Sequence, residues 1–319
     1  MRPPDPPPGT PRLARTAWLV LGWNVAVILW GAFVRATGSG AGCGAHWPLC
    51  NGELLPRAPA LATLIELTHR VTSGLALLAV GFLAVRVFRS KPKRHPARSA
   101  AAFSALFILS EAAVGAGLVL FRLVAENESV ARALFMAVHL MNTFVLLACL
   151  TLTAHWCGSD SRPRLLERPI WPLAAATLAL LLVGISGAVA ALGDTLSPAR
   201  SLLGGLADDI SPTAHFLVRL RVAHPPLALI GALATVAAAA SVLRVHRQAA
   251  LRRLSWTLSG LVLLQLGAGL VNVMLLAPVW LQLVHLLLAD LVWIAFVLMA
   301  VRSLSPERPP QQASVAAAA

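Results

Sequence analysis

The sequence predicts an all-α integral membrane protein with eight transmembrane helices. Of its 319 residues, 58% are hydrophobic and only 12% are charged, whereas soluble domains carry roughly 25% charged residues. The mean hydropathy is +0.76. The apolar residues gather in eight long runs, each close to the roughly 20 residues that a helix needs to cross a bilayer.

The runs divide the chain into two halves of four helices each. They fall at about residues 17–36, 63–88, 100–122, 132–156, 169–192, 216–243, 255–276 and 280–302. We therefore expect two four-helix bundles with pseudo-symmetry, over 17–156 and 169–302, joined by a linker at 157–168. The polar, Pro-rich ends 1–16 and 303–319 are expected to be disordered tails.

The distribution of basic residues predicts the orientation of the chain. The formal net charge is +13, and more than two thirds of the 26 Lys and Arg lie in the tails or in loops on the same side as the tails. The positive-inside rule places that side, and both termini, in the cytoplasm. Two long loops, at about 37–62 and 193–215, then face outward. Because orientation in the membrane accounts for the positive net charge, we expect membrane lipids and no nucleic acid as partners.

Short motifs recur in the same order in the two halves. GAGL occurs at 115–118 and at 267–270, and VHL occurs at 138–140 and at 284–286. Because each half has four helices, both halves enter the membrane in the same direction. This pattern predicts a parallel repeat about an axis along the membrane normal.

Four histidines lie at matching depths in the even-numbered helices. They are His69, His139, His224 and His285, each about 5–8 residues into its predicted helix, or roughly 8–12 Å. An ionisable group inside the membrane is a functional candidate. Two imidazoles from facing helices can hold a haem iron from both sides, so we predict one haem per half. Hydrogen-bonded packing and another metal are the alternatives.

The two halves differ in the residue that precedes the first histidine of each pair. Glu66 lies three residues before His69, on the same helix face, whereas Arg221 occupies the matching position before His224. A carboxylate beside only one pair favours chemistry in the first half, where it could transfer protons. The alternative is a simple ion pair between Glu66 and Arg70.

Other charged and small residues lie near the histidines. Glycine- and alanine-rich stretches could admit a flat macrocycle or could serve ordinary helix packing. Glu111 and Asp290 lie nearer mid-membrane and could carry protons or pair with polar neighbours. Four arginines at the outer helix ends could bind haem propionates or extend to the interface; they are Arg35, Arg70, Arg219 and Arg221.

Two of the four cysteines share the first outer loop. Cys43 and Cys50 face an oxidising compartment in the predicted orientation, which permits a disulfide. The bond could be a structural staple or an exposed redox relay. Cys149 lies within the fourth predicted helix and Cys157 at its end, and we expect both to be unreactive.

The first outer loop and the helix after it resemble haem A synthases of the CtaA/Cox15 family. The matching stretches are GAFVRATGSGAGCGAHWPLCNG and IELTHR, and the resemblance extends over about 17–302. Many family members also carry a cysteine pair in the second outer loop. This sequence has none at 193–215, which puts in doubt any role that requires both pairs.

The resemblance implies an oxidoreductase that converts haem O to haem A for cytochrome c oxidase, by oxidation of the C8 methyl group to a formyl group. It implies that haem b binds at His224 and His285. The substrate haem would bind at His69 and His139, where Glu66 matches the family's essential acid. It also implies a multi-pass protein of a prokaryotic cell (inner) membrane, with its site toward the outer face and haem O synthase as substrate donor.

Two other functions fit parts of the pattern. A dihaem cytochrome b could relay electrons from quinol, and a parallel repeat could form a transporter, although Pro225 and Pro226 break only the sixth helix. A haem O synthase would carry Asp-rich diphosphate-binding motifs, which this sequence lacks. The electron donor, the route of dioxygen and the presence of a homo-oligomer stay open at this point.

Overall fold

The computed structural model describes residues 11–159 and 170–305. This part of the chain contains no strand, and it has eight spans that are long and apolar enough to cross a membrane. The prediction of an all-α, multi-pass membrane protein is confirmed. The spans are α1 (Pro11–Ala36), α2 (Leu61–Ser90), α3 (Pro96–Leu120), α4 (Val130–Cys157), α5 (Trp171–Leu196), α7 with α8 (Phe216–Val245), α9 (Ala249–Met274) and α10 (Val279–Ser303).

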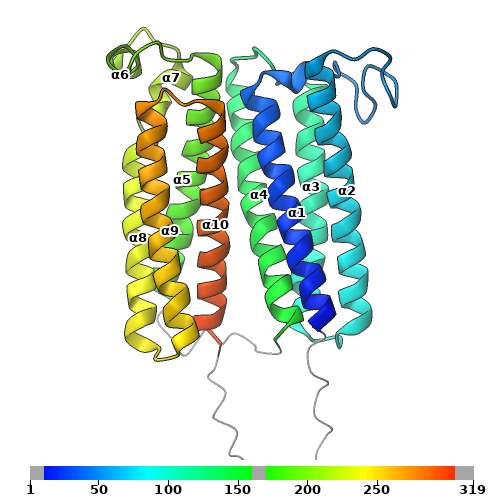
Figure 1. The fold of residues 1–319 in the computed structure, drawn as a ribbon, viewed down its shortest axis with the longest axis vertical. Coiled ribbons are helices and arrows are strands. Elements are labelled where there is room, and N and C mark those ends of the chain that lie inside the picture. Colours follow the sequence, from blue (N-terminus) through cyan, green and yellow to red (C-terminus); the bar gives the residue numbers. More distant parts are fainter. Residues whose placement is uncertain (1–10, 160–169, 306–319) are drawn as a thin grey trace, which may run out of the picture.

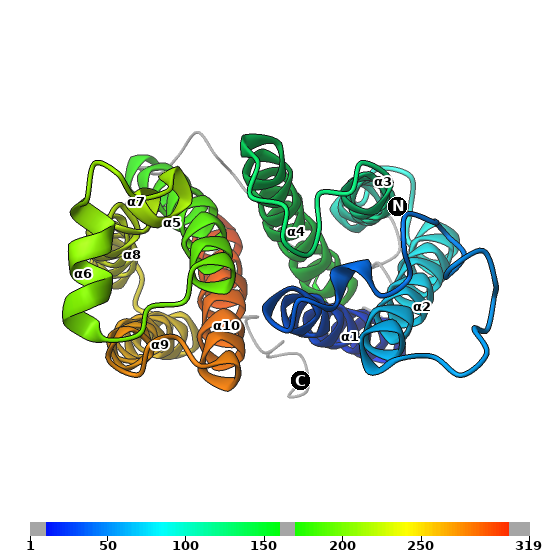
Figure 2. The same cartoon turned by 90° about the horizontal axis from the view of Figure 1, so that it is seen from above.

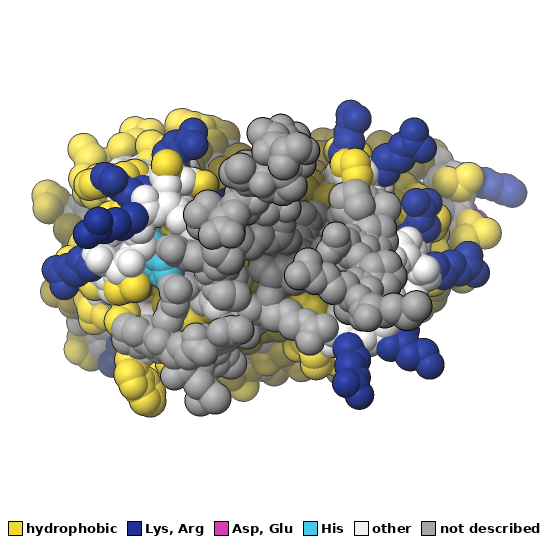
Figure 3. All heavy atoms as spheres, turned by 90° about the horizontal axis from the view of Figure 1, so that it is seen from below, with side chains coloured by type: hydrophobic (Ala, Val, Ile, Leu, Met, Phe, Trp, Pro, Cys, Tyr) yellow, Lys and Arg dark blue, Asp and Glu magenta, His cyan; other side chains and the backbone are white. Residues whose placement is uncertain are grey.

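The helices form two groups that stand side by side (Figures 1 and 2). We call α1–α4 the first half and α5–α10 the second half. Helix α1 begins and α10 ends at the same end of the molecule, which we call the inner end; the long loops lie at the outer end. Figure 3 shows Lys and Arg side chains around the rim of the inner end; the location of this end in the cytoplasm stays a prediction of the positive-inside rule.

The two halves share one apolar core. Helix α4 contacts both α5 and α10, and α1 also contacts α10. The ring of Phe144 on α4 stacks on that of Trp293 on α10, with centroids 5.4 Å apart. Nε1 of Trp293 donates a hydrogen bond to the Phe144 carbonyl oxygen at 2.7 Å. The buried cluster around these rings includes residues of every span, so the halves pack as one body along α4 and α10.

The first helix starts earlier than the sequence pattern predicts. Helix α1 begins at Pro11, so the prediction of a disordered tail is wrong for residues 11–16. Proline is favoured in the first turn of a helix, where its missing N–H leaves no bond unmade, and Leu13 is only 2% exposed within the core. Residues 1–10 and 306–319 of the predicted tails, and residues 160–168 of the predicted linker, lie outside the described residues.

The sixth span is broken near its outer end, at the prolines that the sequence singles out. Helix α7 (Phe216–Arg221) ends just before α8 (His224–Val245) begins. Pro225 and Pro226 occupy the first turn of α8, where a proline cannot continue a preceding helix. His224 therefore lies at the start of α8.

The second outer loop contains a short helix that the hydropathy pattern does not predict. Helix α6 (Leu202–Ile210) lies at the outer end of the second half (Figure 1). The side chain of Ser201 caps it by accepting a hydrogen bond from the Gly204 N–H at 3.1 Å.

Candidate functional site

All four predicted histidines lie toward the outer ends of their spans. His69 is on α2, His139 on α4, His224 at the start of α8 and His285 on α10. Each lies within about the first ten residues of its span. One histidine pair therefore belongs to each half, as the sequence predicts, and both pairs are at a similar depth.

The rings of His224 and His285 lie close together in the second half, in an edge-to-face arrangement. Their centroids are 6.4 Å apart and their planes are at 89°. Two imidazole nitrogens that each bind one metal ion at about 2 Å place the ring centres roughly 6 to 6.5 Å apart. Nδ1 of His224 is hydrogen-bonded to Ser186 Oγ at 3.0 Å, which leaves Nε2 available. The separation therefore fits a metal centre held between the two rings.

Ring nitrogens without partners occur in both halves. Among the described residues, Nδ1 of His69, of His139 and of His285 is buried without a hydrogen-bond partner, and only that of His139 has a carboxylate beside it, Glu111 at 3.2 Å. A buried polar group of this kind is costly unless a ligand or water satisfies it. The rings of His69 and His285 thus fit the binding of an additional group in each half. Haem is a group that a pair of histidines can hold.

Three of the histidine rings pack against a glycine of the neighbouring helix. A Cβ atom at Gly31 would lie 2.9 Å from Cε1 of His69, and one at Gly269 would lie 3.0 Å from Cε1 of His285. A Cβ atom at Gly187 would lie 3.1 Å from Cε1 of His224. At these positions the small residue provides space for the imidazole itself, because a larger side chain would displace the ring.

His139 has a different neighbour. Its Nδ1 lies 3.2 Å from Oε1 of Glu111 on α3. Glu111 is, with Asp290, one of the two acids whose roles the sequence leaves open. The signal in the sequence was a carboxylate within an apolar run. It could not reveal the partner of Glu111, because His139 is on another helix.

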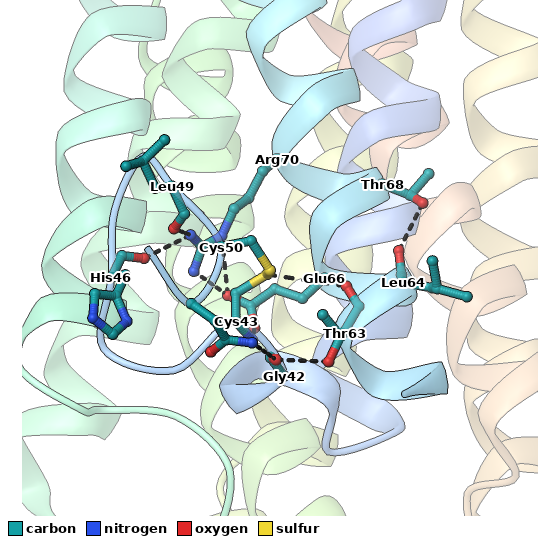
Figure 4. The surroundings of a disulfide bond; sticks show 11 residues. Gly42, Cys43, His46, Leu49, Cys50, Thr63, Leu64, Glu66, Thr68 and Arg70 are labelled. Carbon is teal, nitrogen blue, oxygen red and sulfur yellow. Dashed lines mark hydrogen bonds and ion pairs between the residues drawn. A yellow bond between two sulfur atoms is a disulfide. The ribbon is translucent and has the colours of Figure 1, made fainter. Parts of the chain in front are cut away.

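Glu66 contacts the first outer loop and Arg70 (Figure 4). It is 3% exposed. Its Oε2 accepts a hydrogen bond from the Cys43 N–H at 2.7 Å, and Oε1 pairs with Nη2 of Arg70 at 2.5 Å. The ion pair that the i, i+4 spacing suggests is therefore present. Its two oxygens are engaged on the side of the loop, and the catalytic role of Glu66 stays a prediction.

The predicted disulfide between Cys43 and Cys50 is present, with both residues buried. Arg70 Nη1 donates to the carbonyl oxygens of His46 and Leu49, each at 2.6 Å (Figure 4). In this conformation the sulfur atoms are shielded from solvent. The arrangement favours a staple that orders the loop over Glu66.

The start of α2 holds the same loop from the other side. Thr63 Oγ1 donates to the Gly42 carbonyl oxygen at 2.8 Å. A Cβ atom at Gly42 would lie 2.5 Å from the Ala62 backbone, so only glycine permits this approach. The loop is therefore packed directly onto the helix that carries Glu66 and His69.

The predicted propionate-binding arginines have different surroundings. Arg35 reaches from α1 into the second half and donates to the Ala191 carbonyl oxygen at 2.6 Å. Arg221 pairs with Asp194 at 2.9 Å and with Asp209 at 2.8 Å. Arg219 is exposed and forms no ion pair or side-chain hydrogen bond among the described residues, so its guanidinium is the most accessible of the four to an external anion.

Comparison with known proteins agrees with the resemblance in the outer loop. Residues 14–297 match the family model COX15-CtaA, cytochrome oxidase assembly protein. A Thermus thermophilus protein named protoheme IX farnesyltransferase is 52% identical over 93% of this chain and 49% of its own length. Proteins named heme A synthase are 35% identical in Halalkalibacterium halodurans, over 44% of each chain, and 41% identical in Staphylococcus carnosus, over 34% of this chain and 35% of that relative.

The chain spans about half the length of the Thermus relatives that it matches. The family match, in contrast, runs from the start of α1 to the last turns of α10. It therefore includes all eight spans and all four histidines, and this chain belongs to the COX15-CtaA family of cytochrome oxidase assembly proteins.

Proposed function

We propose that this protein is a haem A synthase that oxidises the C8 methyl group of haem O to a formyl group. The product would be the haem A of cytochrome c oxidase. The observation that carries this proposal is the presence of two unlike histidine pairs at one depth, in a chain of this family. Relatives named heme A synthase support it.

The two pairs would hold two haems with different roles. His69 and His139 would bind the iron of the substrate haem O, close to the carboxylates of Glu66 and Glu111. His224 and His285 would bind haem b, which supplies electrons when bound. The unpartnered nitrogens of His69 and His285 and the 6.4 Å ring separation support these assignments.

The oxidation would proceed as two hydroxylations of the same carbon. Each one inserts an oxygen atom from dioxygen into a C–H bond, consumes two electrons and two protons, and releases one water. Loss of a further water from the resulting diol leaves the formyl group. Glu66 would exchange protons on the outer side of the first half, where Arg70 and the Cys43 N–H hold its carboxylate in place.

Arginines near the outer end would bind the propionates. A bidentate guanidinium suits a carboxylate, and the exposed Arg219 forms no ion pair or side-chain hydrogen bond within the described part of the chain. Arg35, Arg70 and Arg221 already bind groups of the protein, and each would bind a propionate in addition to those groups. The site would face the outer side of a prokaryotic cell membrane.

Haem O synthase would be the substrate donor. The name of the Thermus relatives describes a farnesyltransferase, but this chain covers only 49% of each of them. This chain also has no Asp-rich diphosphate-binding motif. We therefore infer that the transferase activity of those proteins belongs to their unmatched part, and that the two reactions follow one another.

Pigment extraction tests the reaction. The full chain would be expressed with and without a haem O synthase, in a host that makes no haem A. Haem A in the extract only when both proteins are present is the expected result. A farnesylated haem made by this chain alone would favour a transferase, and two bound haems without haem A would favour a dihaem electron relay.

Single histidine substitutions test the cofactor assignment. His224→Ala or His285→Ala should remove a low-spin haem b signal from the purified protein, while His69→Ala should leave it. If the haem b signal survives both second-half substitutions, the assignment of haem b to that half is wrong.

A further inference from the structure

Glu111 lies within a cluster of hydrogen-bonded polar side chains between α3 and α4. Its Oε1 is 3.2 Å from Nδ1 of His139 and also accepts a hydrogen bond from Oγ1 of Thr143. Its Oε2 accepts one from Nδ2 of Asn142. All three neighbours are groups that can donate, and a carboxylate that meets only donors is suited to the ionised form.

The donors of this cluster are themselves oriented. Asn142 is 8% exposed, and its Nδ2 also donates to the Phe107 carbonyl oxygen at 2.9 Å. Its Oδ1 accepts from Ser110 Oγ at 2.6 Å. A charge at this depth is costly unless it is paired and hydrogen-bonded, and these contacts meet that requirement.

The second half has no such carboxylate. In the repeat, Leu263 lies four residues before GAGL, where Glu111 lies in the first half, and it is 67% exposed on the surface of α9. The neighbours of the second histidine pair are neutral: Ser186 Oγ at 3.0 Å from Nδ1 of His224 and Gln265 Nε2 at 3.3 Å from Nε2 of His285. The acid is therefore specific to one pair.

We propose that Glu111 is a positioning residue for His139. Its Oε1 lies 3.2 Å from Nδ1, where it would accept the Nδ1 proton, fix the tautomer of the ring and leave Nε2 to bind the iron of a haem in the first half. A carboxylate partner also makes an imidazole a more basic ligand. This inference rests on the proposed function, because it requires a haem at His69 and His139.

The consequence is a difference between the two haems. A more basic axial ligand stabilises the ferric state, so the first-half haem should have a lower reduction potential than it would with a neutral partner at His139. The haem at His224 and His285 has no carboxylate partner among the described residues and should not depend on Glu111.

A redox titration of the intact protein tests this role. The full chain, loaded with haem b and haem O, would be titrated while absorption and electron paramagnetic resonance spectra are recorded. Glu111→Gln should retain both haems, raise the midpoint potential of the first-half haem and change its axial-ligand signature. Glu111→Asp should restore part of the shift, and Ser186→Ala should change only the second-half haem.

The outcomes separate this inference from the proposed function. If the wild-type protein binds haem O through His139 but Glu111→Gln leaves its midpoint and spectrum unchanged, the positioning role is wrong and the function stands. If His139→Ala leaves haem O binding unchanged, the first-half site itself is wrong. Should Glu111→Gln not fold, Thr143→Val keeps the charge and removes one donor; an unchanged midpoint there would also overturn the role.

Discussion

Arg35 of the first half donates a hydrogen bond from Nη2 to Oε1 of Gln282 in the second half, over 2.8 Å. Its Nη1 also binds the Ala191 carbonyl oxygen at 2.6 Å and the hydroxyl of Thr195. One guanidinium thus joins α1 to both α5 and α10. This contact lies at the outer end, near the level of the histidine pairs.

Removal of the Arg35 side chain should loosen the contact between the halves. Arg35→Ala leaves a carbonyl, a hydroxyl and an amide without their donor, and we expect a loss of about 1–3 kcal/mol. Thermal unfolding of the purified protein in detergent measures this change. Arg200→Ala, at an exposed position of the second outer loop, is the matched control. Equal stability of the two variants would show that Arg35 does not join the halves.

Two glycines of α9 give a matched test of the space beside a histidine. A Cβ atom at Gly269 would lie 3.0 Å from the His285 ring, whereas one at Gly267 would have no atom of another described helix within 4 Å. Gly269→Ala should displace the ring and reduce haem b content. Gly267→Ala should retain it and gain up to about 1 kcal/mol of helix propensity. Haem content per protein, from the pyridine haemochrome spectrum, distinguishes them; equal content in both would contradict the steric role.

The carboxylate of Glu66 should be required for turnover and not for haem binding. Glu66→Gln can still accept the Cys43 N–H, so the loop should stay in place, but it can no longer exchange a proton as a carboxylic acid does. We expect both haems to bind and haem A formation to be lost. Analysis of extracted pigments measures both. Continued accumulation of haem A would rule out the proton-transfer role.

Loss of the disulfide should affect the loop more than the membrane helices. Cys43→Ser opens a bridge between residues seven positions apart, which corresponds to about 2–3 kcal/mol of loop stability. We expect the variant to insert and fold, with increased proteolysis in the loop and reduced turnover as Glu66 loses its fixed partner. Complete loss of turnover, with loop protection like that of the wild type, would instead indicate a redox role for the cysteines.

The sequence predicts the spans and the depth of the histidines because both depend on distance along the chain. Hydrophobic length sets where a helix crosses, and each histidine is counted from that point. Contacts between helices are different, since they depend on how each helix is rotated about its axis. The approach of Glu111 to His139 and of Arg35 to Gln282 could not be predicted for that reason.

Local chemistry accounts for the elements that hydropathy misses. Helix α6 is short and lies in a loop, so its apolar residues do not form a long run. The start of α1 at Pro11 follows from helix-capping preference and from the burial of Leu13, neither of which a hydropathy window detects. The disulfide was predictable because its two cysteines share one outer loop.

The outer loop between α1 and α2 has a consequence for the order of biogenesis. The contacts that close it, among Cys43, Cys50, Glu66 and Arg70, join residues no more than 24 positions apart along the chain. They can therefore form while later helices are still being synthesised, since chains fold from the N-terminal part first. The bond from Arg35 spans 247 positions and must wait for the last helix. Oxidation of the loop would thus precede docking of the two halves.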